Sequence, residues 1–134
     1  MKLLIIIVFL ASATLAQPPD LTHFETVREQ NGIVSLVNVK TVTGDYKAIQ
    51  FDALITQYRI VEEQRYLNPF FYLHIRIRAS CVDHTYSVIR SEKVIGEKVT
   101  LDIPEKTKVE KAEKETDVYM AIDMICEKKF GLLS

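Results

Sequence analysis

The sequence predicts a mainly β protein: a single antiparallel β-sandwich or curved-sheet domain with a short N-terminal helix. Three observations support this fold class. β-Branched residues dominate several runs, as they do in strands. Residues 71–81 alternate apolar and polar side chains without a break. Turn residues separate the runs at short spacings, which favours antiparallel hairpins over parallel crossovers. An α+β curved sheet with a packed helix is the alternative architecture.

Residues 1–16 have the three parts of a secretory signal peptide: a basic start at Lys2, an apolar block and an end of small residues at Ala16. The apolar block is shorter than the roughly 20 residues that span a bilayer. We expect cleavage after Ala16. Residues 17–134 then form one β-rich domain that is secreted to the extracellular space, with no membrane segment after signal cleavage.

The first element of the mature chain is the predicted helix, over residues 20–30. Leu21, Phe24 and Val27 lie three residues apart with charged side chains between them, a spacing typical of a short helix. Asn31-Gly32 follows and predicts the end of this helix, because both residues accept a left-handed backbone.

A strand is predicted over residues 33–42, and a turn over Thr43-Gly44-Asp45. Alternation resumes over residues 49–60 and slips by one position near Gln57, which indicates a bulge or bend. The same stretch carries a helical stripe of apolar residues, so strand and helix both stay open over residues 47–66, with strand favoured.

Residues 71–81 form the clearest strand, and their odd positions from Phe71 to Cys81 are apolar. Further strands are predicted over 86–89, 99–103 and 117–126, the last with even positions facing inward. The charged residues 104–116 predict a solvated loop.

Cys81 and Cys126 are the two cysteines of the chain. An even number in an oxidising compartment favours one disulfide bond between them. Both fall on the apolar side of predicted strands, so the sequence predicts a buried cross-link.

No motif in the sequence indicates catalysis, a metal site or a cofactor. None of the three histidines belongs to an HExxH motif or to a Cys/His cluster, no Gly-x-Ser-x-Gly elbow occurs, and the four glycines stand alone. Without Lys2 the chain carries 16 basic and 18 acidic side chains, a balance that argues against nucleic acid as a partner. We therefore expect a protein that is not an enzyme.

Two sets of residues are candidates for binding. Tyr72, His74, Arg76 and Arg78 share the polar side of the strand 71–81, a row suited to a carboxylate, a sulfate or an acidic protein partner. A small apolar ligand inside the domain would instead contact the inward residues of the core, namely Phe51, Phe71, Leu73, Ile75, Met120 and Met124.

Residues Lys40-Thr41-Val42-Thr43-Gly44 resemble the Gln-x-Val-x-Gly hairpin of secreted cystatins at Val42 and Gly44, with Lys40 in place of the glutamine. The resemblance implies an inhibitor of cysteine proteases with an N-terminal helix on an antiparallel sheet. The sequence thus favours a small secreted binding protein for an apolar ligand or a protein partner. A cystatin-like inhibitor and an enzyme without a recognisable motif are the alternatives.

Overall fold

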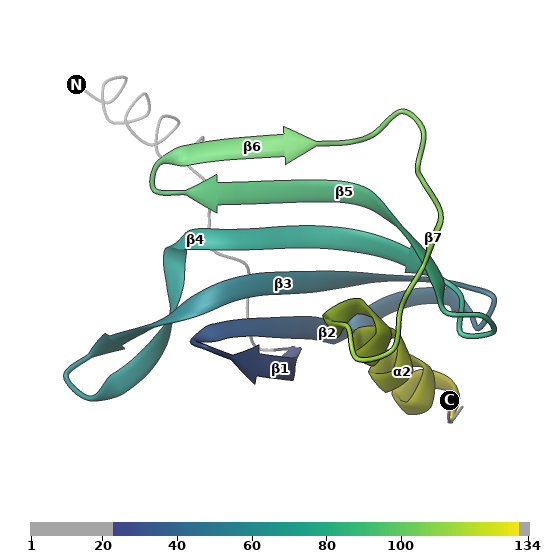
Figure 1. The fold of residues 1–134 in the computed structure, drawn as a ribbon, viewed down its shortest axis with the longest axis horizontal. Coiled ribbons are helices and arrows are strands. Elements are labelled where there is room, and N and C mark those ends of the chain that lie inside the picture. Colours follow the sequence, from purple (N-terminus) through teal and green to yellow (C-terminus); the bar gives the residue numbers. More distant parts are fainter. Residues whose placement is uncertain (1–22, 132–134) are drawn as a thin grey trace, which may run out of the picture.

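A computed structural model describes residues 23–131 and shows one antiparallel sheet with one helix beside it (Figure 1). Strands β1 to β6 follow one another across the sheet in chain order, and the short β7 pairs with β5. The prediction of a mainly β antiparallel domain is confirmed, as a curved sheet and not a sandwich. The elements are β1 (Phe24–Gln30), β2 (Ile33–Asp45), β3 (Ala48–Val61), β4 (Gln64–Ala79), β5 (Thr85–Ile95), β6 (Lys98–Asp102), β7 (Glu110–Lys111) and α2 (Asp117–Phe130).

The stretch that sequence left open, residues 47–66, is strand, as favoured. It forms β3, the turn after it and the start of β4. The predicted slip near Gln57 is also confirmed, because the β3–β4 register shifts between Thr56 and Tyr58. Thr56 is buried there, and its hydroxyl donates to the carbonyl oxygen of Phe71 at 2.6 Å, which ties the two strands at the irregularity.

The prediction of an N-terminal helix is wrong: residues 24–30 form strand β1, which pairs with β2. The three-residue spacing of Phe24 and Val27 has another origin. The register shifts between Thr26 and Arg28, so Val27 occupies a bulge. Phe24 packs against one apolar cluster and Val27 against the other, on opposite faces of the sheet. A helix would have placed both on one side.

The prediction of a strand over residues 117–126 is also wrong, because these residues begin helix α2. The hydroxyl of Thr116 caps the first turn by accepting from the backbone N–H of Tyr119. Gly131, with a φ of 69°, caps the last turn. The buried residues Ala121, Ile122, Ile125 and Cys126 follow the helical period, although the apolar run also fits alternation.

The sheet has a helix face, on which α2 packs, and a far face on the opposite side. The main core lies between α2 and the helix face and contains Val37, Phe51, Ala53, Ile77 and Ile122. A second apolar cluster packs on the far face, formed by Val34, Leu36, Leu54, Tyr72 and Val94. Both faces of the sheet therefore bury apolar side chains.

This arrangement corrects the predicted sides of β4. Ile77 and Ala79 are buried as expected, but Phe71 is 37% exposed and the supposedly outward Tyr72 is only 3% exposed. The reason is that α2 covers only one end of the helix face (Figure 1). Towards the other end, the buried side of β4 is the far face.

The charged segment after β6 is mostly exposed, as predicted, with Ala112 as a buried exception. It crosses one end of the sheet, adds β7 to β5 and leads into α2 (Figure 1). The predicted signal peptide, residues 1–16, lies outside the described residues.

Candidate functional site

The four residues of the predicted binding row do project to one side of β4, onto the far face, but they do not form one exposed surface. Tyr72 belongs to the far-face apolar cluster. Its hydroxyl donates to the carboxylate of Glu92 at 3.4 Å. Burial, together with the negative charge of Glu92, raises the pKa of Tyr72 above its usual value. Tyr72 is thus a structural residue and not part of an accessible surface.

His74 and Arg76 meet a carboxylate that the sequence did not single out, that of Asp52 on β3. Arg76 Nη1 lies 2.9 Å from Asp52 Oδ2, and His74 Nε2 lies 3.6 Å from Asp52 Oδ1. Burial by itself would raise the pKa of Asp52, but the hydrogen bond from His74 and the charge of Arg76 outweigh it, and the net pKa lies below 3.8. Asp52 is therefore an ionised anchor for Arg76.

Two threonines of β2 complete this anchor. Thr41 donates its hydroxyl to Asp52 Oδ2 at 3.3 Å, and Arg76 Nη2 donates to Thr43 Oγ1 at 3.5 Å. The guanidinium of Arg76 is therefore fixed from two neighbouring strands. A side chain held in this way loses less conformational entropy when a ligand binds it.

Arg78 and Arg90 extend the row on either side of Arg76. Arg78 lies two residues further along β4, and Arg90 is the cross-strand partner of Arg76 on β5, so all three point to the far face. Arg78 and Arg90 are exposed. Over residues 23–131, neither has a carboxylate within 4.0 Å. We call Arg76, Arg78 and Arg90 the arginine face.

The six residues proposed to line an internal ligand site are divided among different surroundings. Phe51 is fully buried in the main core, whereas Phe71 is partly exposed beyond the reach of α2. Leu73, Ile75, Met120 and Met124 are partly buried, the last two on the helix. Within residues 23–131, these six residues therefore do not share one environment.

The two cystatin-like residues have structural roles in the β2–β3 hairpin. Val42 is 9% exposed and packs in the main core, where its carbonyl oxygen accepts from Lys129 Nζ of α2 at 2.8 Å. Gly44 has a φ of +90°, and a Cβ there would overlap the carbonyl oxygen of Ala48. The turn itself therefore requires this glycine. Val42 is therefore buried, whereas Gly44 is exposed at the turn.

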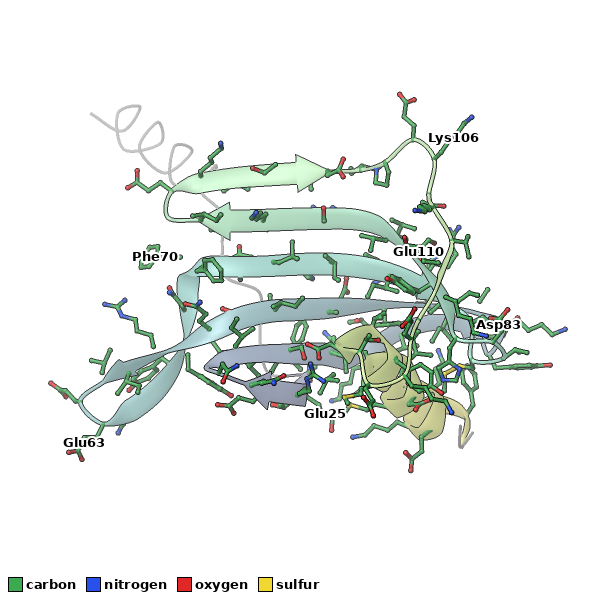
Figure 2. All side chains as sticks on the ribbon, viewed as in Figure 1. Glu25, Glu63, Phe70, Asp83, Lys106 and Glu110 are labelled. Carbon is green, nitrogen blue, oxygen red and sulfur yellow. A yellow bond between two sulfur atoms is a disulfide. The ribbon has the colours of Figure 1, made fainter. Side chains whose placement is uncertain are left out.

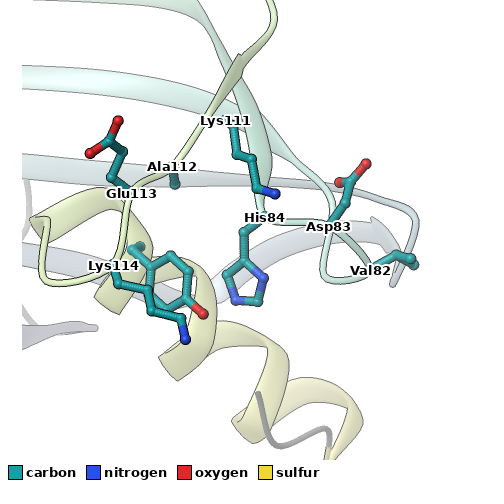
Figure 3. Close-up of a pocket in the computed structure, with 8 residues that line it drawn as sticks. Val82, Asp83, His84, Lys111, Ala112, Glu113 and Lys114 are labelled. Carbon is teal, nitrogen blue, oxygen red and sulfur yellow. The ribbon is translucent and has the colours of Figure 1, made fainter.

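A pocket of about 400 Å³ lies where the β4–β5 turn meets α2, and Figure 3 shows His84 and the surrounding lysines in it. The ring of His84 stacks on Tyr119 at 4.2 Å, and its Nε2 lies 2.6 Å from Asp123 Oδ1. His84 has a φ of +57°, so the turn aims it at the helix. No sequence pattern indicates this pair, because 39 residues separate its members.

The predicted disulfide is confirmed beside this pocket. Cys81 and Cys126 are bonded with their Cα atoms 5.9 Å apart. The bond joins the turn after β4 to α2, and not two strands as expected. Among residues 23–131 no group of three or more metal-ligating side chains occurs. In the same range, no helix is long and apolar enough to cross a membrane.

The fold defined by these elements is an antiparallel meander with a C-terminal helix on one face. No protein-family model matches the sequence, and no curated protein matches it significantly. Among solved structures the chain is similar to protein E of Haemophilus influenzae, with 14% identity, a TM-score of 0.56, and coverage of 90% of this chain and 97% of that one. A crystal structure of protein E from non-typeable Haemophilus influenzae gives 15% identity and a TM-score of 0.50, covering 90% and 89% of the two chains. At this identity the likeness shows a shared fold.

Proposed function

We propose that this chain is a secreted, non-enzymatic binding protein whose arginine face docks an acidic protein partner. The observation that carries the proposal is the pair of exposed arginines, Arg78 and Arg90, beside the fixed Arg76. Guanidinium groups bind carboxylates through two parallel hydrogen bonds, so a row of them selects a surface rich in aspartate and glutamate.

The charge of the whole chain makes this row distinctive. The full sequence has a net charge of −1, so three arginines on one face are a local excess and not a general property of the surface. Among the three arginines, Asp52 pairs with Arg76 only, and it holds this side chain in place. The remaining two positive charges attract a partner and orient it at encounter.

A protein partner fits this surface better than a small apolar ligand does. Arg78 and Arg90 are exposed, and the pocket that Arg78 lines has a volume of only about 120 Å³. Small ligands are usually held in concave, mostly apolar sites of roughly 300–1,000 Å³. The non-enzymatic part of the proposal rests on the sequence, in which no motif indicates catalysis.

The binding experiment uses the mature, oxidised chain and a fluorescently labelled poly-glutamate peptide, with anisotropy measured at low and physiological salt. Replacing Arg78→Gln and Arg90→Gln together removes about two charge-assisted contacts, and we expect binding to weaken about tenfold. The matched control is Lys106→Gln with Lys108→Gln, which removes the same charge from the exposed loop after β6, where Lys106 stands clear of the sheet (Figure 2).

The control should change the affinity for the peptide less than about twofold, because exposed charges that do not contact the peptide contribute little to binding. Equal losses in both double variants would reduce the effect to overall charge and contradict the proposal, as would a parent chain that does not bind the peptide.

Export is checked on material secreted from a cell: its mass should place the first residue within two positions of Gln17. Secreted protein that keeps residues 1–16 would overturn this part.

A further inference from the structure

Strand β6 is an edge strand, and in the described part of the chain no strand pairs with its outer side. All five of its residues are exposed, and it pairs only with β5. Its register with β5 is unbroken from Lys98 to Asp102. The opposite edge strand, β1, is interrupted by a bulge, one of the devices by which proteins protect an edge. β6 has no such interruption before Pro104.

The backbone of β6 offers its free hydrogen-bonding groups at alternate positions. Gly96 and Glu97 form the two-residue turn between β5 and β6, so the flanking Ile95 and Lys98 are the hydrogen-bonded pair next to the turn. In an antiparallel ladder such pairs alternate with pairs whose N–H and C=O groups point outward. Val99 and Leu101 therefore present their backbone groups at the free edge.

The side chains of β6 are complementary to the same strand running in the opposite direction. If two copies pair around Thr100, Lys98 of each lies opposite Asp102 of the other, and Val99 lies opposite Leu101. Both ion pairs join opposite charges, and both apolar pairs lie on the far face, where Val99 is 44% and Leu101 is 52% exposed. Val99 and Leu101, which lie opposite each other in this pairing, are also the residues whose backbone N–H and C=O groups point outward.

We propose that β6 pairs antiparallel with β6 of a second copy, centred on Thr100, to form a twofold dimer with one continuous sheet. The surface is isologous, as closed dimers require, and the occupant is this chain itself. Because residues paired across an antiparallel ladder share a face, both arginine faces lie on one side of the dimer and both α2 helices on the other. A multivalent acidic partner would then meet two arginine faces at once.

The register makes a cross-linking test specific. In the proposed pairing Thr100 lies opposite Thr100 of the second copy, with Cα atoms about 4.5 Å apart, a separation that a disulfide spans. Lys98 of one copy is offset by four residues from Lys98 of the other, about 14 Å, which a disulfide does not span. Incubated with oxidised glutathione, the Thr100→Cys chain should form a covalent dimer on a non-reducing gel, and the Lys98→Cys chain should stay monomeric. Equal cross-linking of both, or of neither, would overturn the proposal.

A charge-swap experiment tests the dimer without a cross-link. Lys98→Glu places two carboxylates opposite each other at each end, and Asp102→Lys places two ammonium groups there. Sedimentation equilibrium should show dimers for the parent chain at the upper end of a concentration series, and monomers for each single variant. An equimolar mixture of the two variants should dimerise again, because every facing pair is then of opposite sign. A parent chain that is monomeric throughout would refute self-pairing and leave β6 as an edge for a different chain. Circular dichroism of each variant shows that the fold is retained, as expected for exposed positions.

Discussion

Loss of the Cys81–Cys126 bond should lower the stability of this domain more than most single substitutions do. The bond closes a chain segment with a sequence separation of 45 residues, for which the chain-entropy model gives about 4 kcal/mol. With an unfolding entropy of about 2.1 cal/mol/K per residue and the roughly 110 residues that the structure describes, this corresponds to a fall in melting temperature of roughly 15 °C. Cys126 is 4% exposed between α2 and the sheet, so Cys126→Ser also buries a hydroxyl in the main core.

The measurement is thermal unfolding followed by circular dichroism without reductant. Cys126→Ser should melt about 15 °C below the parent, and the parent with reductant should melt at a similar temperature. The double variant Cys81→Ser with Cys126→Ser is the control, and reductant should leave its melting temperature unchanged. Two free thiols titrated in the folded, oxidised parent would refute the reasoning, and so would a fall of less than about 3 °C in both reduced and substituted chains.

Two further predictions concern Asp52 and Gly44. Because the pKa of Asp52 is lowered in the folded state, its carboxylate contributes stability that is present above pH 3.8 and is lost as the pH falls through the folded pKa. Asp52→Asn should therefore destabilise the domain at pH 7 and have little effect at the acid end of a series of urea-unfolding measurements. An equal loss of stability at every pH would show that the charge is not involved. Gly44→Ala should destabilise by about 1–3 kcal/mol, because it combines a left-handed backbone with a clash. The control Gly96→Ala has a φ of +62° and open space around it, so it should cost less in the same denaturant titration; a larger cost at Gly96 would contradict the steric argument.

The sequence was sufficient to predict the strands from β2 to β6, because their patterns are local. Alternation over 71–81 and the slip near Gln57 both correspond to the observed register. The two elements that were predicted wrongly are short segments whose apolar spacing fits both a helix and a strand. At Val27 a bulge imitates a helical spacing, and at residues 117–126 an apolar run satisfies both periods until the caps at Thr116 and Gly131 are considered.

Only the part of the candidate site that lies on a single strand, β4, was predictable from the sequence. His74, Arg76 and Arg78 share a side of β4 by their spacing alone, and this was confirmed. Asp52 and Arg90 come from the neighbouring strands, so they can be assigned only when the pairing register is known. The burial of Tyr72 was not predictable either, since it depends on how much of the sheet α2 covers.

The order of the strands has a consequence for how the chain folds. Each strand from β1 to β5 pairs with the strand that follows it, so each of these five ladders closes through a short turn, at a small cost in loop entropy. Such local pairings form quickly. Helix α2 instead contacts β1 and β2, which precede it in the chain by more than 70 residues, so its docking is a long-range step. We therefore expect the hairpins to form first and the helix to dock last. The two cysteines then meet only in a nearly complete fold, so oxidation follows the formation of the sheet and does not guide it.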